Sequence, residues 1–247
     1  MNQDRYLKTL HRGFYTLYNL GLLKNDSRFK YHYLIKDIIE KDDTVVDIGA
    51  NLGYFSKNFA KLTPNGQLLS IEPVKPFFDV LTYFMKGYPQ AKIVNYALGS
   101  ESGSITMILP ESNGMIRTGL PHIAKSEEEK KNNKTHEVQI VKGSELLSSL
   151  DNIDYVKCDI EGYELVVFNE IKAVISAKKP IVQIEIGPEN ENAMFDYFDS
   201  LEYEQYGVAN FKVVKENRTQ KEQGDFLFVP KSKTASFEKR MKSKGRM

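Results

Sequence analysis

Asp159 and Glu161 are two carboxylates separated by one apolar residue, at the end of an apolar segment that is predicted to be a buried strand, residues 153–160. The carboxyl ends of the strands form the ligand-binding edge of open α/β sheets. Packing does not explain the pair, because burying an unpaired charge is costly. We interpret Glu161 as a general base for an acceptor hydroxyl, and Asp159 as a residue that orients the acceptor or the reactive end of a cofactor.

Two further carboxylates are predicted to lie near this pair. Glu164 falls in the first turn of the following helix, where the helix dipole favours a negative charge, so we interpret it as a capping residue. Glu185 lies in the next predicted strand, residues 181–186. Oxygen ligands of this kind can hold Mg²⁺, but the spacing is not specific for a metal, and we predict no metal site.

A second set of candidate residues lies in residues 44–55, where a β-branched segment runs through two glycines into a helix-forming segment. This pattern predicts a strand, a tight turn and a helix, an arrangement that binds nucleotide-like cofactors. A dinucleotide site would need G-x-G-x-x-G, which is absent here. A carboxylate at the strand's end repels a pyrophosphate but attracts an ammonium or a sulfonium, and S-adenosylmethionine carries both cations. We therefore assign to its site Asp47, Gly49, Asn51, Gly53, Tyr54 and Phe55.

Glu72 follows a second apolar segment, residues 67–71. In nucleotide-binding α/β folds, an acid at this place accepts hydrogen bonds from the ribose hydroxyls. We therefore expect Glu72 to bind the ribose of the cofactor. An acid here fits a dinucleotide as well as S-adenosylmethionine, so the choice between the two cofactors depends on Asp47.

Asp47-x-Gly49-x-Asn51-x-Gly53, followed by Ile71-Glu72-Pro73, resembles the cofactor site of class I S-adenosylmethionine-dependent methyltransferases. Three further motifs narrow the resemblance to the FkbM family: Asn95-Tyr96-Ala97-Leu98-Gly99, Lys157-Cys158-Asp159-Ile160-Glu161-Gly162-Tyr163-Glu164 and Asp225-Phe226-Leu227-Phe228-Val229-Pro230. The resemblance to the FkbM family covers roughly residues 30–230. The resemblance implies methyl transfer to a hydroxyl of a sugar, a polysaccharide or a small natural product, and it adds Asn95 to the cofactor-binding residues.

Strands alternate with helices over residues 41–230, which predicts one α/β domain with right-handed crossovers. The resemblance implies a Rossmann-like three-layer sandwich, with a mostly parallel seven-stranded sheet and an antiparallel last strand. Residues 1–40 are predicted to form amphipathic helices that cover this core. Residues 231–247 hold seven basic residues and one acid, and we expect a flexible tail, with weak contact to a membrane surface as the lesser alternative.

Residues 110–137 interrupt the domain with glycines and prolines, followed by the charge run of residues 127–131. Long loops of this kind in compact domains often act as lids, and we expect a mobile surface loop that reaches the cofactor cleft. His122 lies in it and is the rival general base, provided that the lid closes. Arg117 and His136 are also suited to orient an acceptor or move a proton, His136 least because it adjoins the next strand, but we expect all three residues simply to be exposed.

Composition limits the alternatives. The 247 residues include 34 lysines and arginines against 33 acids, so no overall field attracts nucleic acid, and we predict a small-molecule or glycan acceptor. The single cysteine, Cys158, excludes a disulfide within the chain and favours the reducing cytoplasm, and no apolar run reaches the roughly 18 residues of a membrane span. Two other functions stay open: an NAD-linked enzyme, and a non-catalytic module that keeps the fold and the cofactor.

Overall fold

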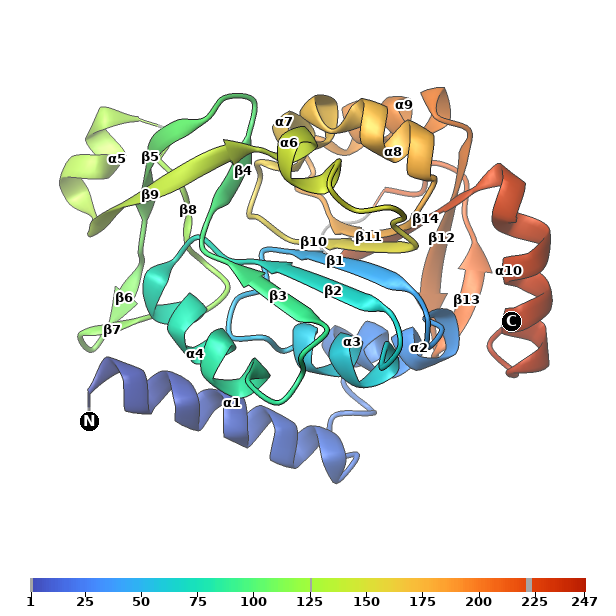
Figure 1. The fold of residues 1–247 in the computed structure, drawn as a ribbon, viewed down its shortest axis with the longest axis horizontal. Helices are drawn as coiled ribbons and strands as arrows, with labels where there is room; N and C mark the ends of the chain where they lie inside the picture. Colours follow the sequence, from blue (N-terminus) through green and yellow to red (C-terminus); the bar gives the residue numbers. More distant parts are fainter. Residues whose placement is uncertain (1, 125, 221–223) are drawn as a thin grey trace.

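The computed structural model describes residues 2–124, 126–220 and 224–247. Its central layer is a twisted sheet with helices on both faces (Figure 1). Eight strands of the described chain form this sheet, in the order β13-β12-β14-β11-β10-β1-β2-β3. Their bounds are β1 (Thr44–Ile48), β2 (Gln67–Ile71), β3 (Ala91–Val94), β10 (Tyr155–Cys158), β11 (Ile181–Glu185), β12 (Tyr203–Ala209), β13 (Lys212–Lys215) and β14 (Asp225–Pro230).

The predicted fold class is confirmed. The sheet is mostly parallel, and the last strand, β14, lies antiparallel between β11 and β12. The prediction of seven strands is wrong by one, because β13 pairs antiparallel with β12 at the edge. Asn210 and Phe211 both adopt positive φ, of 50° and 59°, and this tight reversal returns the chain beside β12.

Helices of the described chain cover both faces of the sheet. One face carries α6 (Gly143–Leu147), α7 (Glu164–Glu170), α8 (Lys172–Lys178) and α9 (Glu191–Ser200). The other carries α2 (Lys30–Ile38), α3 (Ser56–Leu62), α4 (Lys75–Met85) and α10 (Lys231–Ser243). Side chains of β1 alternate between the two cores: Val46 and Ile48 pack with the first set of helices, and Val45 with the second.

The segment predicted to be a lid is more regular than expected. A second sheet, in the order β4-β9-β5-β8, lies beside the main one and is built from β4 (Ala97–Gly99), β5 (Gly103–Ile108), β8 (His122–Ile123) and β9 (Thr135–Lys142). A short hairpin precedes β8, formed by β6 (Glu111–Ser112) and β7 (Met115–Ile116). The charge run forms α5 (Glu127–Asn132) because Ser126 caps it and its acids precede its lysines.

Both ends of the chain pack on the domain. Helix α1 (Gln3–Asn19) lies along α4 and buries Leu7, His11 and Tyr15, and the short 3-10 helix η1 (Ser27–Phe29) leads into α2. The expectation of a flexible C-terminal tail is wrong for α10, because Phe237 and Met241 are buried against the domain. No helix of the described residues is both long and apolar enough to cross a membrane.

Candidate active site

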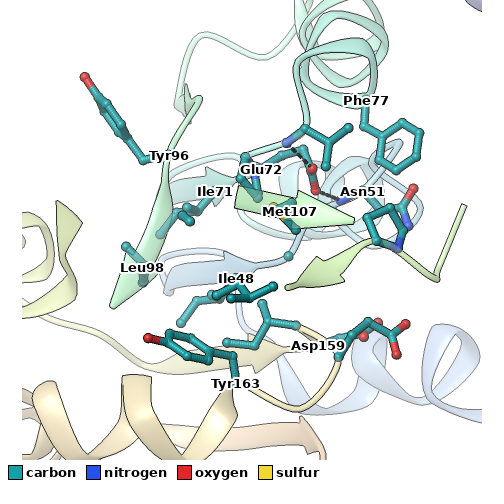
Figure 2. Close-up of a pocket in the computed structure, with 18 of the residues that line it drawn as sticks. Ile48, Asn51, Ile71, Glu72, Phe77, Tyr96, Leu98, Met107, Asp159 and Tyr163 are labelled. Carbon is teal, nitrogen blue, oxygen red and sulfur yellow. Dashed lines mark hydrogen bonds between the residues drawn. The ribbon is translucent and has the colours of Figure 1, made fainter. Parts of the chain in front are cut away.

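A narrow cleft opens where β1, β2 and β10 end (Figure 2). Its atom-free space, including solvent at the mouth, is about 660 Å³. Its amide and carboxylate side chains are Asn51, Glu72, Asp159 and Glu161. The remaining wall is mostly apolar and aromatic, and includes Ile48, Ile71, Phe77, Leu98, Met107 and Tyr163. The segment of residues 110–137 contributes Gly119, Pro121 and Ile123, so it does reach the cleft.

The turn after β1 has three residues with positive φ: Gly49 at 75°, Asn51 at 52° and Gly53 at 88°. A Cβ on Gly49 would lie 1.9 Å from the backbone oxygen of Asp159, so this glycine allows the ends of β1 and β10 to approach. A Cβ on Gly53 would lie 2.7 Å from Leu81 of α4. The two glycines therefore make room for neighbouring parts of the chain, and Asn51 faces the cleft.

Glu72 lies almost fully buried at the wall of the cleft. Its Oε2 accepts a hydrogen bond from the backbone N–H of Asn51 at 2.7 Å, and its Oε1 accepts one from Val74 at 2.8 Å. Burial raises the pKa of Glu72 to about 7, against the opposing effect of these two N–H groups. An ionised carboxylate has about four acceptor positions, so Glu72 can still accept two hydroxyl hydrogen bonds. The free acceptor positions of Glu72 suit a ligand with two neighbouring hydroxyl groups.

Asn95 lies outside the lining of the cleft, but it supports the turn that carries Glu72. Its Nδ2 donates to the backbone oxygens of Glu72 at 2.8 Å and Pro73 at 2.9 Å. Its neighbour Tyr96 does line the cleft. We therefore interpret Asn95 as a positioning residue for the cofactor site.

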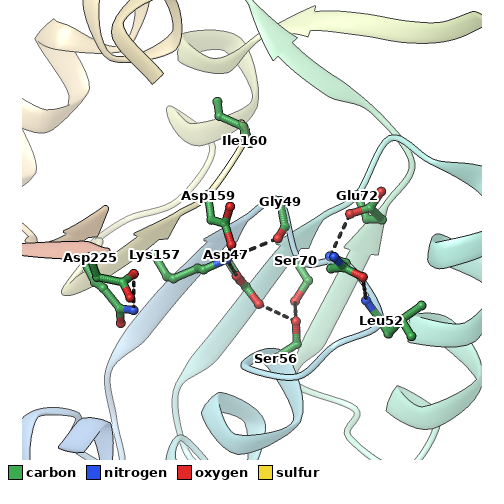
Figure 3. Close-up of polar contacts among 12 residues, drawn as sticks. Asp47, Gly49, Leu52, Ser56, Ser70, Glu72, Lys157, Asp159, Ile160 and Asp225 are labelled. Atoms are coloured by element: carbon green, nitrogen blue, oxygen red, sulfur yellow. Dashed lines mark hydrogen bonds and ion pairs between the residues drawn. The ribbon is translucent and has the colours of Figure 1, made fainter. Parts of the chain in front are cut away.

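Asp47 is fully buried beneath the cleft and does not line it, in contrast to the expected contact with a cofactor cation (Figure 3). Its Oδ2 accepts a hydrogen bond from Ser56 Oγ at 2.5 Å, and Ser70 donates in turn to Ser56. Its Oδ1 lies 3.9 Å from Lys157 Nζ. Since β1 and β10 pair with Asp47 opposite Lys157, the lysine supplies the counter-charge that we had assigned to the cofactor.

Lys157 is the site residue that the sequence reasoning missed. It is buried in β10, and its Nζ lies 3.2 Å from Asp159 Oδ2 and 3.3 Å from the backbone oxygen of Gly49. Burial alone would lower the pKa of Lys157, but the carboxylates of Asp159 and Asp47 outweigh it and raise that pKa. A lysine inside an otherwise apolar strand was the available signal, because a buried charge requires a partner.

Asp159 and Glu161 both line the cleft, as predicted. Glu161 adopts a φ of 55°, at a turn that Glu164 holds by accepting hydrogen bonds from the backbone N–H groups of Ile160 and Gly162. Partial removal from water, together with the carboxylates of Asp159 and Glu164, raises the pKa of Glu161 to about 7. A base with this pKa can take a proton near neutral pH.

Tyr54 and Phe55 point toward the N-terminal helices and do not line the cleft. The backbone oxygen of Tyr54 accepts a hydrogen bond from the Tyr15 hydroxyl at 2.9 Å. The ring of Phe55 stacks on His32, with 3.7 Å between the ring centroids. These two residues therefore anchor the helices that cover the turn.

His122, the rival base, has both ring nitrogens engaged within the segment of residues 110–137. Its Nε2 lies 2.8 Å from Glu129 Oε1, and its Nδ1 lies 2.9 Å from the backbone oxygen of Leu120. In this arrangement neither nitrogen is left to accept a proton from a substrate. Over the described residues, no group of three or more acidic, histidine or cysteine side chains is arranged to hold a metal ion.

A family model described as the methyltransferase FkbM domain matches residues 47–207. Among solved structures, methyltransferase FkbM from Methylobacillus flagellatus KT is similar at 14% identity and a TM-score of 0.52, over 77% of this chain and 44% of that one. The chain thus spans less than half of that protein's length. An S-adenosylmethionine-dependent methyltransferase from Aquifex aeolicus has 11% identity and a TM-score of 0.44, over 85% and 97% of the two chains.

An rRNA methylase from Streptococcus thermophilus has 9% identity and a TM-score of 0.46, over 80% of this chain and 91% of that one. At such identities, a likeness between structures concerns the fold alone. No curated protein matches the chain.

Proposed function

This chain belongs to the FkbM methyltransferase family, and we propose that it transfers a methyl group from S-adenosylmethionine to a hydroxyl of a sugar, a polysaccharide or a small natural product. The family and the fold are those of S-adenosylmethionine-dependent methyltransferases. The observation that carries the proposal is that Glu72, Asp159 and Glu161 line one cleft. An acid suited to a ribose therefore lies in the same space as a pair suited to an acceptor.

In the proposed complex, Glu72 accepts hydrogen bonds from the ribose hydroxyls, and Asn51 and Asn95 hold Glu72 and its turn in place. When bound, S-adenosylmethionine supplies a methyl group that its sulfonium makes electrophilic. The protein then has to align an oxygen about 3–3.5 Å from that carbon and remove its proton. The apolar wall of the cleft limits the access of water to the reacting atoms.

Glu161 is the proposed general base. An alcohol is a weak nucleophile until it loses its proton, and a positioned base contributes about 10²–10⁴-fold to such a step. Asp159 is held by Lys157 at 3.2 Å, so its second oxygen is oriented to accept a hydrogen bond from the acceptor. Glu161 takes the proton, and Asp159 positions the hydroxyl.

Two other functions predict different results. An NAD-linked enzyme would bind NAD, whereas a non-catalytic module would bind S-adenosylmethionine and transfer nothing. Isothermal titration with NAD and S-adenosylmethionine tests the NAD-linked alternative, and we expect heat of binding only with S-adenosylmethionine. Transfer of a labelled methyl group from S-adenosylmethionine to a panel of polyols and glycans tests the non-catalytic alternative. We place this activity in the cytoplasm, in keeping with the one free cysteine, Cys158, which is buried.

A further inference from the structure

A second cavity opens beside the cleft and shares Glu161 with it. Its atom-free space, including open solvent, is about 980 Å³. Its wall includes His122 and four glutamates: Glu161, Glu164, Glu185 and Glu189. We call this cavity the acidic pocket. Among the described residues, its lining contains no lysine and no arginine.

Glu164 presents a buried acceptor without a partner in this wall. Its side chain is almost fully buried, and its Oε1 accepts hydrogen bonds from Ile160 N at 3.3 Å and Gly162 N at 3.0 Å. Its Oε2 has no hydrogen-bond partner in the part of the chain that the structure describes. Leaving a buried acceptor unsatisfied costs free energy. Oε2 is covered in this structure, so a donor from a bound molecule would be stabilised there once the side chain turned toward the pocket.

Among the described residues, few positive groups offset the negative charge of the acidic pocket. Burial and the neighbouring carboxylates of Asp159, Asp225 and Glu161 raise the pKa of Glu185 to about 8. Lys157 opposes this shift, but it pairs with Asp159 and Asp47. His122 already contacts Glu129 and the Leu120 backbone oxygen. A cation that entered the pocket would reduce the repulsion between these acids.

Building on the methyl transfer proposed above, we propose that the acidic pocket binds a protonated amine of the acceptor. The acceptor is therefore a polyhydroxylated amine, such as an amino sugar. Glu161 lines both cavities, so an acceptor whose hydroxyl lies at Glu161 extends into the acidic pocket while the cofactor occupies the cleft. An ammonium group has three N–H donors and no lone pair, so it suits carboxylate oxygens, which only accept hydrogen bonds. An acceptor that carries phosphate, nucleic acid included, would meet charges of its own sign.

The test uses three probes that share a polyhydroxyl chain and differ in charge: 1-amino-1-deoxysorbitol, sorbitol and sorbitol 6-phosphate. Each is titrated into the full chain loaded with S-adenosylhomocysteine at pH 8, where an alkylamine stays protonated. We expect the amine to bind at least tenfold more tightly than sorbitol, and the phosphate to bind least. Glu185→Gln should remove most of the tenfold preference, whereas Glu128→Gln, on the exposed face of α5, should leave it unchanged.

Equal affinity for the amine and sorbitol would overturn the inference, as would tighter binding of the phosphate or no binding of any probe. Binding of Mg²⁺ alone that Glu185→Gln abolishes, without a preference for the amine, would replace it with a metal site. The titration does not depend on turnover. If the protein prefers the amine but transfers no methyl group, only the proposed function is contradicted. If it methylates neutral acceptors but shows no preference for the amine, only the present inference is contradicted.

Discussion

Lys157 Nζ lies 3.2 Å from Asp159 Oδ2, so a buried strand residue orients one of the two acids at the mouth of the cleft. The same ammonium lies 3.9 Å from Asp47 Oδ1, beneath the cleft. One lysine thus links Asp159, at the cleft, to Asp47, which precedes the turn of residues 49–53. Asp47 and Asp159 both depend on Lys157 for counter-charge.

Replacing this lysine should destabilise the protein. Lys157→Met leaves Asp47 fully buried without its cation, and breaking a buried pair from one side costs about 3–5 kcal/mol. Denaturant unfolding measures the loss. Lys130→Met is the control, because its pair with Glu127 is exposed, and it should cost at most about 1 kcal/mol. Adding Asp47→Asn to Lys157→Met should recover part of the stability, and no recovery would contradict the pairing.

Glu72→Gln should weaken the binding of S-adenosylmethionine. The substitution removes the charge that strengthens the two ribose hydrogen bonds, each worth about 1.5–3 kcal/mol when charged. It also sets the amide NH2 of glutamine against the backbone N–H of Asn51 or Val74, so one of these two hydrogen bonds is lost. Titration calorimetry should show a loss of tenfold or more. Glu101→Gln, on an exposed turn, serves as the control. Unchanged affinity in a folded Glu72 variant would place the ribose elsewhere.

The rate at saturating cofactor should rise with pH and level off above about 7. The pKa of Glu161 is raised to about 7, and only its ionised form can take the proton of the acceptor. The rate therefore falls as the pH drops below this value. A pH profile of turnover measures the midpoint, and Glu161→Gln should abolish this limb of the profile. The same limb in that variant would assign the titration to another group.

Removing α5 should change acceptor use more than cofactor affinity. This helix contacts His122 through Glu129, and the adjoining β8 contributes Ile123 to the cleft. A Gly-Ser linker in place of residues 126–133 frees this part of the lid. We expect the KM for the acceptor to rise severalfold while the Kd for S-adenosylhomocysteine stays the same. An equal change in both constants would show that α5 supports the whole site.

Sequence reasoning predicted those parts of the site that depend on strand order. The segments that became β1, β2 and β10 are short apolar runs, and parallel strands present their carboxyl ends at one edge. Glu72, Asp159 and Glu161 therefore reached one cleft, as expected. Glu164 does lie in the first turn of α7, as expected, but its carboxylate accepts hydrogen bonds from the preceding turn of residues 160–162.

The remaining features depend on packing that a linear pattern does not specify. The register of β1 against β10 sets Lys157 opposite Asp47 and thereby withdraws Asp47 from the cleft. Asn95 faces a backbone turn that only the folded sheet creates. Helix α10 is strongly basic in sequence, yet Phe237 and Met241, four residues apart on one face, pack it on the domain.

Turnover of the Glu161→Gln variant at saturating S-adenosylmethionine tests the central claim most directly. We predict a fall of about 10²–10⁴-fold with unchanged cofactor affinity, because the variant loses only the base. His122→Ala, measured in parallel, should keep most of the activity, since its ring nitrogens are engaged by Glu129 and Leu120. Near-normal turnover in Glu161→Gln, together with a collapse in His122→Ala, would contradict the account and make His122 the base.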